Sequence, residues 1–193
     1  MKTNKEDHET QLIHQIVQGD TASFRILVDR YKDVAYSLAC SIIKNPEAAE
    51  DALQDAFVKA FRSLPKFRFK ASFSTWFYRI VINTCYSTIE KQKKQPTTPL
   101  DNLTLSHQSL DANTFDLLQD EERKAIINQI LNQLKPKEAL VLKLHYLGEL
   151  PIAEIAKVTK MTVANIKVVL HRARKNFQSA LDQLLGNEKK HLL

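Results

Sequence analysis

Apolar residues recur at helical spacing along most of this chain, and no stretch of useful length alternates between apolar and polar residues as a half-buried strand does. In the segment 21–44, for example, apolar side chains fall three or four positions apart, which is the spacing of one helix face. The sequence contains only three glycines and six prolines, so few positions interrupt these patterns. The periodicity therefore predicts an all-α fold.

Start and stop signals divide this pattern into separate helices. Asn45 and Pro46 supply an N-cap and a first helical residue, with acids in the first turn that follows. Pro65 ends the same helix. The other expected helices run from near Glu9 to Gly19, over 21–44, from about Thr75 to Lys93, and over 117–134, 136–148, 150–158 and 162–185.

The charged residues form two basic blocks separated by an acidic strip. Residues 1–95 hold 15 basic and 11 acidic side chains, and residues 123–193 hold 13 and five. Between them, residues 96–122 hold six acids and no Lys or Arg. Prolines, Ser, Thr and Asn without a strong period are typical of a linker. We therefore predict two helical domains, 1–95 and 117–187, a flexible acidic linker, 96–116, and a tail, 188–193.

Several functional classes find no support in the sequence. No run approaches the roughly 20 apolar residues of a membrane helix, and the polar N-terminus lacks the pattern of a signal peptide. Cys40 and Cys85 lie in apolar helical surroundings, which favours reduced core thiols and a cytoplasmic location. His171 has no partner at metal-ligand spacing, and no motif of a hydrolase or a phosphate-binding loop is present. We expect no membrane insertion, cofactor, metal or catalysis.

The segment 151–175 has the pattern of a helix, a tight turn and a second helix. Thr162 is placed to cap the second helix, in which no acid occurs from 163 to 177. One side of that helix is apolar and the other basic, as in a recognition helix that enters the major groove of DNA. The alternative is a solvated cationic face on an ordinary helical hairpin. The predicted core side consists of Val163, Ile166, Leu170, Ala173 and Phe177, and the predicted DNA contacts are Asn165, Lys167, Val168, His171, Arg172, Arg174 and Lys175.

A second unusual stretch, residues 66–83, combines six aromatic rings with four basic side chains and no acid. Basic groups follow a phosphate backbone and rings stack on bases, which is the usual chemistry of single-strand binding. A base that is unpaired or flipped out can be held in a loop between such groups. The alternative is that the rings belong to the core. We favour the core for Phe57, Phe61 and Phe77 and leave both readings open for Phe67, Phe69 and Trp76.

Together these segments resemble a known family. The stretches "AEDALQDAFVKAF" and "FKASFSTWFYRIVIN", the linker, and "LPIAEIAKVTKMTVANIKVVLHRARK" occur in the order and spacing of bacterial RNA polymerase sigma factors of the extracytoplasmic-function (ECF) group. The resemblance covers residues 20–185. A helix-turn-helix alone is moderately specific, because many regulators share it, whereas the two halves together are highly specific.

The resemblance implies a factor that binds the polymerase core and directs initiation at promoters. Residues 1–95 would correspond to region two, which opens the −10 element, and residues 117–187 to region four, whose recognition helix reads the −35 element. The implied partners are core polymerase (the β′ clamp helices and the β flap), promoter DNA and an anti-sigma protein. The residues assigned to −10 opening are Phe67, Arg68, Phe69, Lys70, Ser72, Trp76, Arg79 and Asn83, and those assigned to polymerase binding are Asp51, Gln54, Asp55 and Val58.

Some positions depart from the family pattern. Lys160 stands in the turn where a glycine is common, and Val168 and Val169 replace a polar and a basic residue. Ser87 and Glu90 stand where an acid and an arginine are often found. These changes leave the class intact and leave the −10 and −35 sequences open.

A stand-alone helix-turn-helix regulator is the main rival interpretation. Its N-terminal half would dimerise or sense a signal, and it would bind an operator without polymerase. That interpretation gives the acid-free aromatic stretch no role. It also leaves the polar face that carries Asp51 and Asp55 as a solvated surface, which is what such a face usually is.

Overall fold

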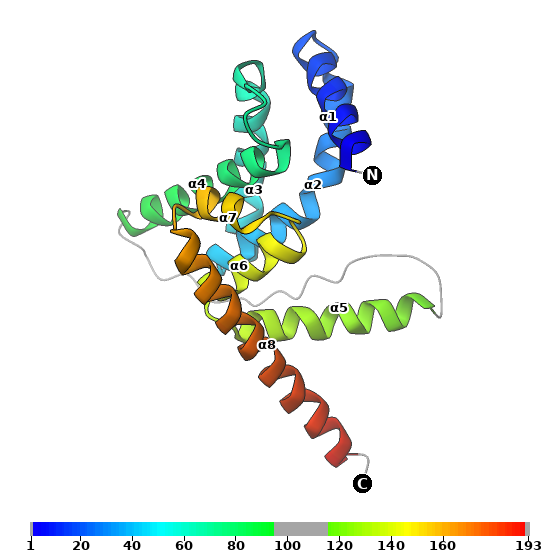
Figure 1. Cartoon of the computed structure of the whole chain (residues 1–193), viewed down its shortest axis with the longest axis vertical. Coiled ribbons are helices and arrows are strands. Elements are labelled where there is room, and N and C mark those ends of the chain that lie inside the picture. The colour runs from blue at the N-terminus through cyan, green and yellow to red at the C-terminus, as the bar shows by residue number, and fades with distance from the viewer. Residues whose placement is uncertain (1, 95–115, 192–193) are drawn as a thin grey trace.

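The computed structural model describes the backbone of residues 2–94 and 116–191 and the side chains of residues 8–93 and 123–184. These ranges are helical and contain no strand, which confirms the all-α prediction for them; most of the predicted linker lies outside them. None of these helices is apolar over a length that could cross a membrane. The elements are α1 (Lys2–Val17), α2 (Thr21–Ile42), α3 (Pro46–Ser63), η1 (Leu64–Lys66), α4 (Phe73–Lys94), α5 (Asp116–Gln133), α6 (Pro136–Tyr146), α7 (Ile152–Thr159) and α8 (Val163–His191) (Figure 1).

Local caps set several helix ends where the sequence predicts them. The Asp20 carboxylate accepts hydrogen bonds from backbone N–H groups in the first turn of α2, the shorter at 3.0 Å. Asn45 Oδ1 does the same for α3 at 2.9 Å. Two ends differ from expectation, because α1 begins at Lys2 rather than near Glu9, and α8 extends to His191, past the predicted domain end.

Helices α2, α3 and α4 pack on one another around the first half of the core. A row of buried alanines on α3 lets its neighbours approach closely. Phe77 is fully buried and lies 4.6 Å, centroid to centroid, from the half-buried Phe57. Phe61 is exposed, so its assignment to the core is wrong: its ring packs edge-on against the half-buried Phe24, 5.0 Å away, at the rim of the α2–α3 contact.

A buried carboxylate ties α1 to α2. Glu9 accepts hydrogen bonds from the Tyr31 hydroxyl and from Arg30 Nη1, the latter at 3.1 Å. Burial and the bond to Glu9 both raise the pKa of Tyr31, so this hydroxyl remains protonated and donates. Helix α1 also contacts η1, and its His14 stacks on Phe69 of the loop that joins η1 to α4.

The second half of the chain contains the predicted helix-turn-helix. Helix α8 packs on α5, α6 and α7. Lys160 ends α7 with φ 58°, a left-handed conformation that glycine adopts more easily, which explains why glycine suits this turn. Thr162 Oγ1 accepts a hydrogen bond from the Asn165 N–H at 3.2 Å, which confirms the predicted cap.

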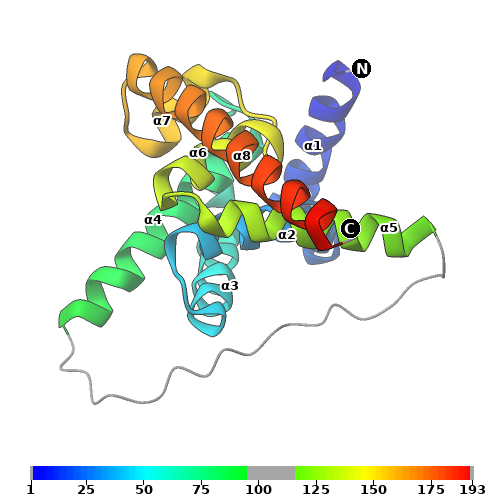
Figure 2. The ribbon, with the colours of Figure 1, turned by 90° about the horizontal axis from the view of Figure 1, so that it is seen from below.

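The two halves pack against each other, which the sequence did not predict. Helix α6 lies on α2, and α7 lies on α4, as Figures 1 and 2 show from two directions. Lys143 Nζ of α6 donates a hydrogen bond to the Ser37 carbonyl of α2 at 2.8 Å. Gly148 follows α6 so close to Tyr78 of α4 that an added Cβ would lie 3.1 Å from its ring. One continuous core therefore runs through both halves.

Candidate nucleic-acid interface

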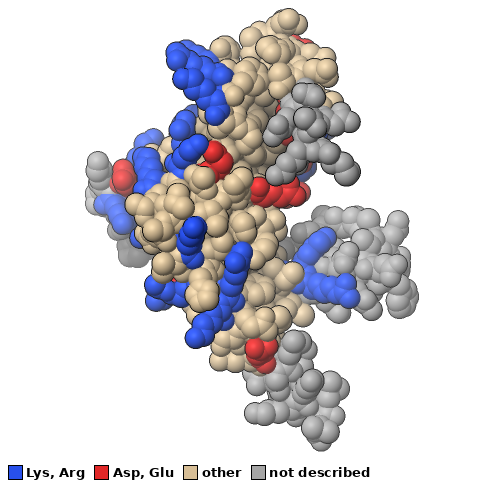
Figure 3. Space-filling view, in the orientation of Figure 1, with Lys and Arg blue, Asp and Glu red and all other residues tan. Residues whose placement is uncertain are grey.

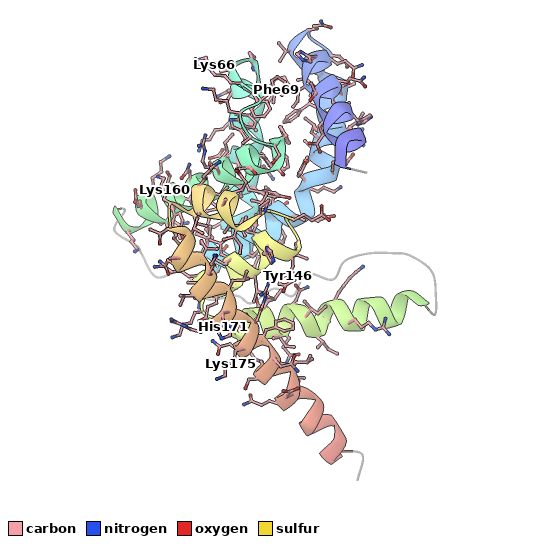
Figure 4. All side chains as sticks on the ribbon, viewed as in Figure 1. Lys66, Phe69, Tyr146, Lys160, His171 and Lys175 are labelled. Carbon is pink, nitrogen blue, oxygen red and sulfur yellow. The ribbon has the colours of Figure 1, made fainter. Side chains whose placement is uncertain are left out.

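The loop between η1 and α4 presents Phe69 from a strained backbone. Its φ is 53°, in the left-handed region where a bulky side chain is uncommon. The ring is 44% exposed and lies between His14 of α1 and Phe67, at centroid distances of 5.5 and 4.8 Å (Figure 4). Such strain costs about 1–3 kcal/mol and persists only where surrounding contacts impose it. The loop is therefore built to hold this ring at the surface.

The rings of this region divide into a core set and a surface set. Phe73 and Phe77 are buried between α2 and α4, which confirms the core reading for Phe77. Phe67 and Trp76 are half-buried, and their ring centroids lie 4.9 Å apart. Together with Phe69 they form a contiguous run of rings at the rim of the core. This run can meet a ligand without unfolding any helix.

Basic side chains surround two of these rings, Phe67 and Trp76, in a cavity of about 410 Å³ between the loop, α4 and α7. Lys66 contributes from η1, and Glu154 and Lys157 line the opposite wall from α7. Figure 3 shows Lys and Arg side chains spread over this face of the molecule, with few acids among them. We call this cavity the basic cavity. The residues lining it that the sequence assigned to −10 opening are Phe67, Arg68, Lys70, Trp76 and Arg79.

The other three residues assigned to −10 opening, Phe69, Ser72 and Asn83, do not line this cavity. Ser72 Oγ accepts a hydrogen bond from the Thr75 N–H at 3.3 Å and donates one to Thr75 Oγ1 at 3.0 Å, so its hydroxyl caps α4. Asn83 is exposed on α4, one turn beyond Arg79 and on the same stripe. Contact of any of the three with DNA stays a prediction.

A smaller cavity, of about 190 Å³, lies on the α1 side of the loop. Glu9, Thr10 and Ile13 line it from α1, and Phe67 and Phe69 line it from the loop. Sequence reasoning assigned α1 no part in the site. Helix α1 carries no motif of its own. The sequence indicated its role only indirectly, because an exposed run of rings needs a neighbouring element to orient it.

The residues assigned to polymerase binding form an open stripe on α3. The opposite side of α3 is buried against α2 and α4, which leaves this stripe facing solvent. It combines two carboxylates with one polar and one apolar side chain, so it offers charge and apolar area together. The four exposed residues are Asp51, Gln54, Asp55 and Val58.

Helix α8 presents its predicted basic face to solvent. Its core side, including Ile166 and Leu170, is buried, whereas Val163 is 44% exposed. The core assignment of Val163 is wrong, because as the first residue of α8 it precedes the turn whose side chains reach the core. Figure 4 shows His171 and Lys175 projecting from one side of the helix. All residues predicted to contact DNA are exposed, namely Asn165, Lys167, Val168, His171, Arg172, Arg174 and Lys175.

Arg174 lies on the flank of that face and is already engaged. Its Nε donates a hydrogen bond to the Tyr146 hydroxyl at 2.8 Å, and its guanidinium carbon lies 5.5 Å from the centre of the ring. Both residues border an apolar groove of about 430 Å³ between α5, α6 and α8, lined also by Ile127, Leu131 and Leu147. The sequence analysis missed this groove, although exposed apolar residues at helix ends were a signal for it.

Comparison with known proteins assigns both halves. Residues 27–95 match the family model Sigma-70 region 2, and residues 124–177 match Sigma-70, region 4. The ECF RNA polymerase sigma factor SigW of Bacillus subtilis (strain 168) is 32% identical over 181 residues, covering 89% of this chain and 96% of that protein. The RNA polymerase sigma-H factor of Pseudomonas aeruginosa is 29% identical over 193 residues, covering 93% and 97%.

A solved structure has the same fold. CnrH in complex with the cytosolic domain of CnrY superposes with a TM-score of 0.60 at 21% identity, covering 89% of this chain and 96% of that one. The family matches lie in the order expected from the resemblance, and the SigW match spans both halves and the segment between them. The chain therefore belongs to the ECF RNA polymerase sigma factors of the sigma-70 family.

Proposed function

We propose that this chain binds the RNA polymerase core and directs the start of transcription at promoters. The observation that carries the proposal is that one chain presents a run of rings beside a basic cavity and a helix with a basic, acid-free face. The first suits unpaired bases, and the second suits the major groove. Such a factor needs no catalytic group of its own, and its place of action would be the cytoplasm.

Opening of the −10 element would use the loop and α4 together. Phe67, Phe69 and Trp76 would give unpaired bases a surface to stack on, which replaces the stacking lost from the duplex. Arg68 and Arg79, which line the same basic cavity, would hold the phosphates. Strand separation is then favoured because both the bases and the backbone find partners on one surface.

Reading of the −35 element would use the open face of α8. Lys167 and Arg172 are long enough to bond base acceptors or phosphates in the major groove, and Val168 could touch a thymine methyl. Each lost base contact should cost about 1–3 kcal/mol. Arg174 would add less, because its guanidinium is held by Tyr146.

Two surfaces remain for polymerase. The stripe on α3 around Asp51 and Asp55 would dock on the β′ clamp helices. The apolar groove beside Tyr146 has the form that receives one face of an amphipathic helix, and the β flap would supply it. Domain limits of 1–95 and 117–187, with a linker between them, suit a factor that reaches both DNA elements at once.

An anti-sigma protein is proposed as a further partner. The solved structures of CnrH and of Bartonella quintana RpoE hold, respectively, the cytosolic domain of CnrY and the anti-sigma factor NepR. A stand-alone regulator is disfavoured, since it would leave the strained loop and its rings without a use.

Run-off transcription on sheared genomic DNA, with core polymerase plus or minus the chain, tests the proposal. New 5′ ends that share two short motifs at fixed spacing would support it. Asp55→Arg, on the α3 stripe, should abolish these starts, while Asp33→Arg, at an acid that is also exposed but lies on α2, should retain them. Specific duplex binding without polymerase, and no new starts with it, would favour the stand-alone regulator.

A further inference from the structure

A small cavity of about 230 Å³ lies where α2 of the first half meets α5 and α6 of the second. Two of its lining residues, Leu131 and Lys143, also border the apolar groove beside Tyr146. None of them belongs to the surfaces proposed for the −10 and −35 elements. Its lining includes two lysines, a hydroxyl, a thiol and an amide, and no acid. We call it the junction cavity.

Lys143 is the buried cation of the junction cavity. All side chains of α6 from Glu138 to Leu144 are buried, and Lys143 is 6% exposed. Its Nζ donates a hydrogen bond to the Ser37 carbonyl at 2.8 Å, so the ammonium lies against α2. Ser37 is one turn before Cys40 and Ser41, which line the cavity from the same helix. The charged end of Lys143 therefore lies on the α2 side of α6, where the cavity is.

The charge of this ammonium is not balanced by the described residues. They give Lys143 no acidic partner, and its one acceptor, the Ser37 carbonyl, also accepts a hydrogen bond from Ser41 Oγ at 3.0 Å. An ammonium carries three donors, and a buried charge is normally paired. Burial lowers the pKa of Lys143, which reflects the cost of holding its charge away from water. An anion beside Nζ would supply the opposite charge and accept a further hydrogen bond.

The other lining groups indicate which anion fits. Lys44, exposed just past the end of α2, adds a second ammonium at the rim, and Asn132 adds an amide that can donate. Leu131, Leu134 and Ala139 are buried and form an apolar wall. At about 230 Å³ the cavity is smaller than the roughly 300–1,000 Å³ of pockets that hold drug-sized ligands. The cavity suits a small anion with a short apolar body, and a nucleotide is too large for it.

We propose that the junction cavity binds a small organic carboxylate, with its oxygens at Lys143 and Lys44 and its hydrocarbon chain on the apolar wall. A phosphate fits less well, because it would turn unpaired oxygens toward that wall. The lining comes from α2 and from α5 and α6, so one ligand would contact both halves and stabilise the folded chain by mass action. The site goes beyond promoter recognition and does not depend on it.

Titration of the full, ¹⁵N-labelled chain with sodium hexanoate at constant ionic strength tests the site by NMR. Amide signals of 40–44 and 131–143 should shift and saturate. Lys143→Met keeps an apolar stem and removes the buried charge, and it should weaken binding at least about tenfold, as expected for loss of a hydrogen bond to a charged group. Lys44→Met should weaken binding about two- to fivefold, because that lysine is exposed.

Matched controls separate the carboxylate from the chain that carries it. Lys137→Met removes an exposed lysine from the same helix and should bind hexanoate like wild type. Hexanamide has the same chain without the charge, so it should bind wild type at least about tenfold more weakly. Inorganic phosphate should also bind more weakly than hexanoate.

The inference is overturned if no signal saturates, or if wild type and Lys143→Met bind hexanoate equally. Shifts centred on Tyr146 and Phe177, with Lys44→Met unchanged, would overturn it too, because hexanoate would then occupy the apolar groove. Phosphate that binds more tightly than hexanoate would refute the assignment to a carboxylate. If circular dichroism shows Lys143→Met unfolded, Lys44→Met and hexanamide decide, and wild-type affinity in both tests refutes the site.

Discussion

Replacing Phe69 by alanine removes the most open ring of the loop and tests whether these rings hold bases. In the free chain the ring contacts His14 and Phe67, and an aromatic pair contributes about 0.5–1.5 kcal/mol. Because the ring is 44% exposed, its loss should lower the free energy of unfolding by only about 1 kcal/mol. Stacking on a base contributes about 1–3 kcal/mol, so opening should fall by about 5- to 150-fold.

Permanganate reactivity of thymines in the −10 element measures this opening directly. Saturating amounts of each variant would be mixed with core polymerase and promoter DNA. Reactivity should fall in Phe69→Ala, while footprinting should still detect the closed complex, because α8 and the α3 stripe are unchanged. Urea unfolding of the free variant gives the stability change for comparison.

Two further substitutions separate the ring from the backbone strain beneath it. Phe69→Leu keeps an apolar side chain but no flat face, so it should unfold nearly like wild type and open DNA as poorly as Phe69→Ala. Phe69→Gly relieves the left-handed strain, so it should be more stable than Phe69→Ala yet open DNA no better. A Phe69→Ala factor that opens the promoter as readily as wild type would refute the stacking argument.

The same structure predicts the effects of four other substitutions. Trp76→Ala should impair strand opening more than closed-complex binding, and normal permanganate reactivity would contradict this. Lys160→Gly should raise the free energy of unfolding, measured in urea, by about 1 kcal/mol, because glycine has no Cβ to be strained at φ 58°. A loss of stability would show that the lysine makes a contact that outweighs the strain. Arg172→Ala should lower the salt slope of −35 duplex binding by about one. Arg174→Ala should lower that slope less and reduce stability by about 0.5–1 kcal/mol, since it loses a tyrosine contact at an exposed site; equal slopes for the two variants would contradict the difference between them.

Signals confined to one segment were enough to predict the helices and to select most residues of the candidate nucleic-acid interface. The caps at Asn45 and Thr162 lie within one turn of the N–H groups that they satisfy, so neighbouring residues alone determine them. The basic face of α8 follows from helical spacing in the same way. The rings and basic groups of 66–83 are adjacent in the chain, so a loop and one helix bring most of them to one cavity.

The sequence-based predictions of burial and position were wrong or incomplete for residues whose surroundings are set by a neighbour on another helix. Helical spacing placed Phe61 and Val163 on core faces, but whether a face is covered there depends on how far the next helix extends. The position of Phe69 depends on a left-handed backbone and on His14 of α1, and neither has a local signature.

The sequence alone determined that this chain is helical and which side of α8 is basic, since periodicity and capping are properties of a single segment. Only the tertiary structure decided that α6 of the second half packs on α2 of the first and that α7 lines one wall of the basic cavity. Lys143 shows the difference, because a lysine in a helix is expected at the surface, and its burial depends on Ser37, 106 residues earlier in the chain. Which surfaces meet over such distances depends on their combined shape, apolar area and charge, and no stretch of sequence contains that information by itself.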